Sequence, residues 1–291
     1  MPISIGSRVV LRYKLPPGYS HPMTDVIGTL ESADPITVRG NDGRVVTVSA
    51  DQVIALKVLA ARPIRVGDIR NLEIAAAAGS PGTEQARIDG WLLRIGHSPH
   101  DMDSALPLGE PGGSASRTPE TLATIRSWFA DRGRPTTLML PDRLGLAPST
   151  WISGGEGIMF AADLDNVAPT PPQFTTTIDD ARAGDSLTLV AAGTIGSADT
   201  MILASARAAV SDAPDGRRWA GLLDLAVAHA HRRHGIGTLI CTDLLGWSRI
   251  QGATHAYLAV PEDNTAAVAT ARSLGFVEHH RYRYATAPVG A

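Results

Sequence analysis

The first 59 residues alternate apolar and polar positions in short runs. Runs at residues 8–15, 25–33, 36–40 and 45–59 have the two-residue period of half-buried strands, and turn-forming residues separate them. Asn41-Asp42-Gly43 contains an Asp-Gly step, which favours a tight hairpin turn. This segment therefore predicts a small β-barrel of about the size of an SH3-like module.

In residues 62–166 the spacing of apolar residues predicts both helices and strands. Thr118 can cap a helix and Pro119 suits its first position, so a helix start is predicted there. The expected elements are helices at 66–78 and 119–131 and strands at 91–95 and 136–140.

A proline-rich stretch at residues 167–174 predicts a linker to a third region, residues 170–291. Within it, residues 222–260 read as a strand-helix-strand crossover, which places two parallel strands side by side. The expected elements are strands at 186–195, 200–210, 221–227, 256–260 and 277–284 and helices at 236–251 and 265–273.

Composition limits the classes of partner. The chain has 26 Lys and Arg against 29 Asp and Glu, so no overall basic field attracts nucleic acid or an anionic membrane. The single Cys241 cannot form an internal disulfide, and no Cys/His cluster has metal-site spacing. Neither a secretory signal nor a long apolar run is visible. We therefore expect a cytoplasmic monomer or homodimer that binds no metal, nucleic acid or membrane.

The segment that carries chemistry follows the strand at 221–227. Backbone N–H groups at a helix start have no intrahelical partners, and the helix dipole adds positive charge, so a pyrophosphate is attracted there. Gly235 allows a positive φ angle and Gly237 lets a phosphate approach the backbone, while Arg232 and Arg233 add charge. This glycine turn reads Arg232-Arg233-His234-Gly235-Ile236-Gly237-Thr238.

Residues 175–285 resemble the core of a GNAT superfamily acetyltransferase. The resemblance rests on the glycine turn at its strand-helix junction and on three further motifs: Leu223-Asp224-Leu225-Ala226-Val227, Asn264 and Leu274-Gly275-Phe276. Earlier motifs and the ending are similar to a subgroup in which a degenerate GNAT-like half precedes the working half, some members also carrying an SH3-like module. These are Asp89-Gly90-Trp91-Leu92-Leu93-Arg94, Leu106-Pro107-Leu108-Gly109 and His280-Arg281-Tyr282-Arg283-Tyr284.

The resemblance implies an α+β protein: an SH3-like barrel at 1–59, a degenerate half at 62–166 and an acetyl-CoA-binding GNAT domain at 170–291. The activity implied is N-acetyl transfer from acetyl-CoA directly to a primary amine. Strand backbone would hold the pantetheine arm, the glycine turn the pyrophosphate, and an asparagine the pantetheine or adenosine. The implied cofactor-binding residues are Leu225, Ala226, Val227, Arg232, Arg233, His234, Gly235, Ile236, Gly237, Thr238 and Asn264.

Acetyl transfer requires the amine as its free base, and a general acid can protonate the departing thiolate. The family commonly has a tyrosine for the second role seven residues after the asparagine, where this chain has Ala271. The candidate catalytic residues are the carboxylates Asp224 and Glu262, as base or amine anchor, and the phenols Tyr282 and Tyr284, with Tyr257 as a third phenol. The ordinary alternatives are that the two acids are solvated or salt-bridged surface residues and that the tyrosines pack on a strand face.

Ala271 also favours a second function, a non-catalytic acyl-CoA sensor. A nucleotide-binding phosphate loop is disfavoured, because neither Gly-x-x-x-x-Gly-Lys-Ser/Thr nor Gly-x-Gly-x-x-Gly stands at this junction. The identity of the amine substrate stays open among small amines, aminoglycosides, protein N-termini and lysine side chains. Loops at residues 96–111 and 147–157 are expected to face it. Most of the histidines of this region, a group that includes His279 and His280, are expected at the surface or at strand ends.

Overall fold

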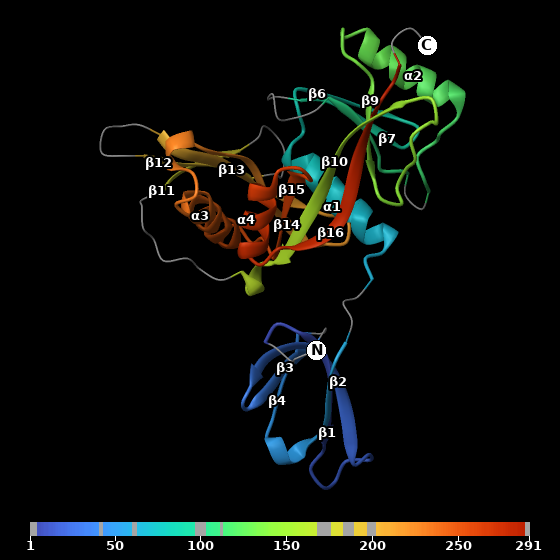
Figure 1. Ribbon diagram of the computed structural model, residues 1–291. Helices are drawn as coiled ribbons and strands as arrows, with labels where there is room; N and C mark the ends of the chain where they lie inside the picture. The colour runs from blue at the N-terminus through green and yellow to red at the C-terminus, as the bar shows by residue number, and fades with distance from the viewer. Residues whose placement is uncertain are drawn as a thin grey trace. The chain divides into compact units, whose positions relative to one another are not determined.

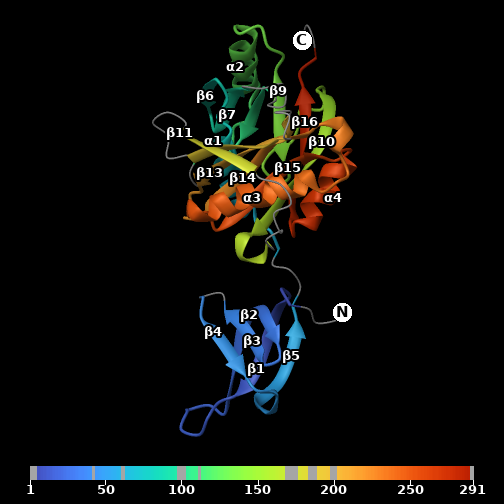
Figure 2. The same ribbon diagram turned by 90° about the vertical axis from the view of Figure 1, so that its left-hand side faces the viewer.

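A computed structural model shows the fold (Figures 1 and 2). It describes residues 5–40, 43–59, 63–96, 103–110, 113–167, 176–182, 189–196 and 202–288. The chain divides into two compact units, Met1–Pro63 and Ile64–Ala291. Within the described residues, none of the helices combines the length and apolar character that crossing a membrane requires.

The first unit is a five-stranded antiparallel sheet of order β4-β3-β2-β1-β5. Its core is formed by Val9, Leu11, Leu30, Val38 and Val48. The strands are β1 Arg8–Lys14, β2 Met23–Ala33, β3 Ile36–Gly40, β4 Val45–Val48 and β5 Val53–Val58.

One strand predicted in this unit is wrong. The segment 45–59 is two strands, because the 3-10 turn η1 Ala50–Gln52 interrupts it. The Ser49 backbone N–H and hydroxyl both donate to the Gln52 side-chain oxygen, at 3.2 and 3.0 Å. This local capping competes with continued strand pairing.

The second unit is built on one eleven-stranded mixed sheet of order β11-β12-β13-β14-β15-β10-β16-β9-β8-β7-β6. Its helices are α1 Val66–Gly79, α2 Pro119–Ala130, α3 Ile236–Ile250 and α4 Thr265–Ser273, with 3-10 turns η2 Leu164–Asn166 and η3 His229–His231. Its strands are β6 Glu84–Ile88, β7 Trp91–Ile95, β8 Ser104–Pro107, β9 Thr137–Pro141, β10 Ile152–Asp163, β11 Thr176–Arg182, β12 Leu189–Gly196, β13 Ile202–Asp212, β14 Arg218–Val227, β15 His255–Pro261 and β16 Val277–Thr286.

Helices α1 and α3 cover opposite faces of this sheet. Ile158 and Phe160 of β10 belong to the core around α3, whereas Met159 and Ala161 belong to the core around α1. Successive strand residues point to opposite faces, so the two helices enclose the sheet between them. The α1 face carries the site described below.

A strand-helix-strand crossover occurs twice in the second unit. Strands β14 and β15 are parallel neighbours joined through α3, and β8 and β9 are parallel neighbours joined through α2. Strand β10 lies between β15 and β16, and β16 lies between β10 and β9. The region before residue 167 and the region after residue 176 therefore share one continuous sheet, to which each contributes its last strand at the centre.

All four predicted helices are confirmed, but strands β6, β8, β10 and β11 were not predicted. The expected loops at 96–111 and 147–157 are wrong in part, because β8 and the start of β10 fall within them. Glycines obscure β10: Gly157 lies where a Cβ would stand 2.2 Å from the Tyr282 ring, so this strand uses glycine for close approach. The linker expected at 167–174 lies outside the described residues, apart from the buried Val167.

Candidate functional site

The site begins where two parallel strands separate. Strands β14 and β15 pair over three positions, of which Gly221 with Tyr257 is the last. Beyond it a β-bulge sets two residues of β14 opposite one of β13, and there Asp224 has a φ of +52°. The bulge turns β14 away from β15 and leaves their facing backbone edges unpaired with each other.

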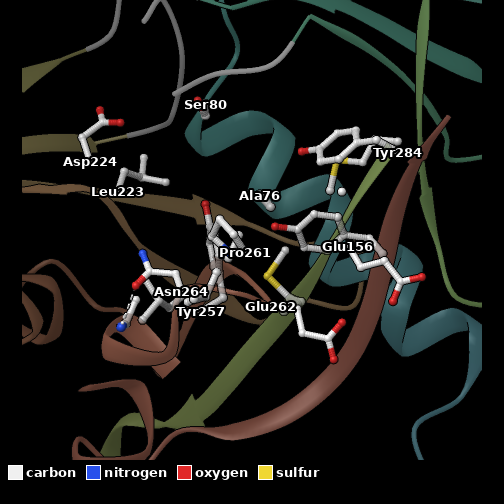
Figure 3. A pocket seen from close by; sticks show the side chains of 18 of the residues that line it. Ala76, Ser80, Glu156, Leu223, Asp224, Tyr257, Pro261, Glu262, Asn264 and Tyr284 are labelled. Carbon is white, nitrogen blue, oxygen red and sulfur yellow. Dashed lines mark hydrogen bonds between the residues drawn. The ribbon is translucent and has the colours of Figure 1, made fainter. Parts of the chain in front are cut away.

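A cavity of about 930 Å³ occupies the opening and continues beneath α1 (Figure 3). Strands β10, β15 and β16 and the start of α4 complete its wall. The predicted site residues that line it are Asp224, Leu225, Glu262, Asn264, Tyr282 and Tyr284. Ala226 and Val227, which end β14, and the glycine turn, which leads into α3, are described residues outside this lining.

The glycine turn presents a row of free amides. Arg233 and Gly235 have φ angles of +67° and +77°, and a Cβ on Gly235 would meet open space. The first backbone bond of α3 runs from the Leu239 N–H to the Gly235 carbonyl at 3.0 Å. Among the described residues, the amides of 233–238 have no hydrogen-bond partner, and no side chain caps the helix. Successive free amides in left-handed turns at a helix start form an anion-binding concavity.

The turn also lies beside the open edge of β14. A Cβ built on Gly237 would stand 3.4 Å from Val227 and 3.7 Å from Leu225, at ordinary contact distances. Arg232 donates from Nε to the Val227 carbonyl at 3.1 Å, so its side chain folds back towards the end of β14. The free amides are therefore adjacent to the strand edge that leads into the cavity.

The two predicted carboxylates both pair with arginines. Asp224 Oδ2 lies 2.5 Å from Arg207 Nε, and Glu262 Oε1 lies 2.6 Å from Arg281 Nη1. The Asp224 side chain is 25% exposed, and that of Glu262 is 45% exposed. Both carboxylates line the cavity, but each already pairs with an arginine that is not part of the lining.

The three phenols differ in burial. Tyr282 and Tyr284 meet edge-on at 5.7 Å between ring centroids, and burial raises the pKa of Tyr282. Tyr257 is 1% exposed, burial raises its pKa, and its hydroxyl has no hydrogen-bond partner among the described residues. A Cβ built on Gly221 would lie 2.2 Å from that hydroxyl, and one built on Gly79 would lie 2.6 Å from it. The hydroxyl therefore lies between α1 and the last residue of β14 that pairs with β15.

Two site residues were missed or misplaced by sequence reasoning. Glu73 of α1 lines the cavity, and its Oε1 lies 2.8 Å from His280 Nε2, both side chains being 1% exposed. The expectation of a surface or strand-end position is wrong for His280, because its side chain lies under α1. A carboxylate among the buried apolar positions of α1, next to Leu72, is the sequence signal that could have identified Glu73.

The structure explains the residue types at two positions on or beside α4. Asn264 Oδ1 accepts from the Ala267 N–H at 3.1 Å and caps the helix, while its side chain lines the cavity. Ala271 is fully buried in the core around α3, so this position contributes no acid group to the site.

Comparison with known proteins assigns nearly the whole chain to one family. Residues 66–285 match the family described as "Probable histone acetyltransferase Rv0428c C-terminal", and residues 3–57 match "Rv0428c N-terminal Sm-like domain". The probable histone acetyltransferase Rv0428c of Mycobacterium tuberculosis is 36% identical over 294 residues, covering 96% of this chain and 94% of that protein. The SH3-like type expected for the first unit is not confirmed, since the matching family is Sm-like.

Solved structures agree on the fold. A GCN5-related N-acetyltransferase from Kribbella flavida has a TM-score of 0.53 at 18% identity, over 78% of this chain and 98% of that chain. A tandem GNAT protein from the clavulanic acid biosynthesis pathway has a TM-score of 0.52 at 15% identity, over 79% and 91%. The chain is thus a GNAT-type N-acetyltransferase of the Rv0428c-like family, with an Sm-like domain preceding the catalytic fold.

Proposed function

We propose that this enzyme moves the acetyl group of acetyl-CoA to a primary amine by direct attack. The observation that carries the proposal is the row of unpaired amides at 233–238, beside a cavity that opens between separating strands. A diphosphate bonded to these amides would direct the rest of the cofactor along β14, since Leu225 and Val227 contact the start of α3.

The cofactor-binding residues predicted from the sequence keep their proposed roles. The backbone of 225–227 would hold the pantetheine arm along the open edge of β14. Arg233 would add charge beside the diphosphate, and Arg232 would do so once released from the Val227 carbonyl. Asn264 would contact the cofactor through the part of its amide that does not cap α4.

Tyr257 is the phenol that we propose at the reaction centre. Its hydroxyl lies where the strands separate and lacks a partner among the described residues. A phenol is protonated at neutral pH even at its ordinary pKa, and burial raises the pKa of Tyr257 further, so the hydroxyl can donate a hydrogen bond to the thioester oxygen or to the departing sulfur. Tyr282 and Tyr284 line the same cavity and stay as the alternative donors.

We propose a cationic amine as the acceptor. The side chains that line the cavity include the guanidinium of Arg94 and five carboxylates, those of Glu73, Glu156, Asp224, Glu262 and Asp263. Carboxylates stay in excess even though Asp224 and Glu262 pair with Arg207 and Arg281. Opposite charge raises the local concentration of an ammonium substrate. The arginine-paired Asp224 and Glu262 would act as anchors for its charge. The name of the Mycobacterium tuberculosis relative makes a lysine side chain in a histone-like basic peptide one acceptor to test.

Residues 62–166 are proposed as a degenerate GNAT-like half. They repeat the crossover of β14, α3 and β15 with β8, α2 and β9. The start of α2 lacks free amides comparable with the glycine turn: Pro119 has no N–H, and the Thr121 N–H donates to the Thr118 hydroxyl at 3.2 Å. This half would therefore support the shared sheet rather than bind a second cofactor.

Binding and turnover can be measured together. We expect calorimetry to show one acetyl-CoA site per chain, and a thiol-release assay to show turnover with at least one amine among polyamines, aminoglycosides and lysine peptides. Binding without turnover on the whole panel would favour the acyl-CoA sensor that Ala271 suggests. Absence of binding would contradict both functions.

A further inference from the structure

Glu73 is a cavity carboxylate to which the proposed cofactor binding and hydrogen-bond donation assign no role. It lies on the face of α1 that packs onto the sheet, and its side chain is 1% exposed. His280 is its only hydrogen-bond partner among the described residues, at 2.8 Å. A buried carboxylate is costly unless it is paired and hydrogen-bonded. Its position among apolar residues of α1 therefore indicates a use beyond packing.

His280 and His279 hold the orientation of this carboxylate. His280 Nδ1 lies 2.8 Å from His279 Nδ1, and His280 Nε2 faces Glu73 Oε1. Burial, with a smaller effect of His280, lowers the pKa of His279 to about 4, so His279 is neutral near pH 7. When Glu73 is ionised, His280 donates its Nε2–H to Oε1, which leaves Oε2 to receive a proton.

Other charged and titratable groups of the site surround Glu73. Arg94 of β7 reaches the cavity from one side, and Tyr257 and Tyr282 reach it from β15 and β16. The charge of Glu73 contributes to the raised pKa of both tyrosines, and Arg94 opposes it. Glu73 is thus within electrostatic range of the Tyr257 hydroxyl, where β14 and β15 separate.

We propose that Glu73 is the general base that accepts the proton of the acceptor ammonium, with His280 and His279 as positioning residues. The inference rests on the proposed acetyl transfer. Glu73 Oε2 takes one N–H proton, and the freed lone pair forms the C–N bond to the acetyl carbon. The C–S bond breaks with its electron pair on sulfur, and a second N–H proton passes to that sulfur. The products are the amide, the free thiol and one proton, which Glu73 then releases to solvent, so the reaction is balanced.

The test uses Glu73→Gln in the full-length chain, with an amine that the wild-type enzyme acetylates. The amide oxygen of glutamine can still accept from His280, but it cannot take the proton. We expect kcat to fall by about 10²- to 10⁴-fold with unchanged acetyl-CoA affinity. Above pH 7 the ratio of wild-type to variant kcat/KM should fall by about tenfold per pH unit. The variant gains because the fraction of the amine that is already a free base in solution rises with pH and needs no base from the enzyme.

Controls separate this role from a structural one. Glu120→Gln, an exposed carboxylate at the start of α2, should leave all parameters unchanged. If the melting temperature shows that Glu73→Gln does not fold, Glu73→Asp retracts the carboxylate by one methylene and carries the same expectation. His280→Gln, which can still donate to Glu73, should retain more activity than His280→Ala.

The outcomes distinguish the base from the overall reaction. Wild-type turnover with an undiminished rate in folded Glu73→Gln would overturn the role of Glu73 and leave acetyl transfer standing. A loss of kcat/KM in Glu73→Gln that is the same at every pH would also overturn the role of Glu73. A packing defect would produce such a constant loss, because free amine does not repair packing. No wild-type turnover on any amine would overturn the proposed function, and this role with it.

Discussion

Gly237→Trp is expected to weaken acetyl-CoA binding by at least about 100-fold, ~2.8 kcal/mol, in a folded protein. Gly237 has no positive φ, and a Cβ there would make ordinary contacts with Val227 and Leu225, so the fold itself does not require glycine at this position. The indole would instead cover the free amides of the turn. Calorimetry with acetyl-CoA measures the loss.

Helix α3 provides a matched control for this substitution. Gly246 lies nine residues further along the helix, on its opposite side, and a Cβ there meets nothing within 4 Å. Gly246→Trp should therefore bind acetyl-CoA as the wild type does. Equal affinities for the two folded variants would show that the cofactor binds away from the start of α3.

Tyr257→Phe is expected to separate stability from activity. The buried hydroxyl has no partner among the described residues, so its removal should raise the free energy of unfolding by about 1 kcal/mol. Loss of one preorganised donor to the reacting thioester should lower kcat by about 10²- to 10³-fold. Stability should rise while kcat falls, because the Tyr257 hydroxyl is unfavourable for folding but useful in the reaction.

Thermal unfolding and steady-state kinetics test both parts of this prediction. Tyr13→Phe, on β1 of the first unit, serves as the control and should leave kcat unchanged. Full activity in Tyr257→Phe would assign the donor role to Tyr282 or Tyr284. A large loss of stability would instead indicate that the Tyr257 hydroxyl has a structural partner.

The anion-binding turn could be predicted because its signal is local. Gly235 adopts the left-handed conformation that its residue type suggests, and Ile236 begins the helix at the predicted residue. Among the residues that the structure describes, no side chain caps the helix at Gly235, so these amides stay free. Each of these features depends on a few consecutive residues, and such features can be recognised without knowledge of the tertiary fold.

The α1 side of the cavity could not be predicted in this way. Glu73 meets His280 across 207 positions of sequence, through a contact that depends on β16 lying beneath α1. The placement of β10 between β15 and β16 is equally non-local, and its glycines conceal the strand pattern at 154–157. Position 271 shows the same limit, since only the packed structure shows that Ala271 lies in the core.

Amide NMR of the 15N-labelled protein, titrated with coenzyme A and with pantetheine, tests most directly whether the turn at 233–238 binds a diphosphate. Pantetheine lacks the diphosphate but retains the arm. Coenzyme A should shift the resonances of Arg233, Gly235 and Gly237, whereas pantetheine should leave them in place and move those near Leu225. Unchanged turn resonances at saturating coenzyme A would contradict the account.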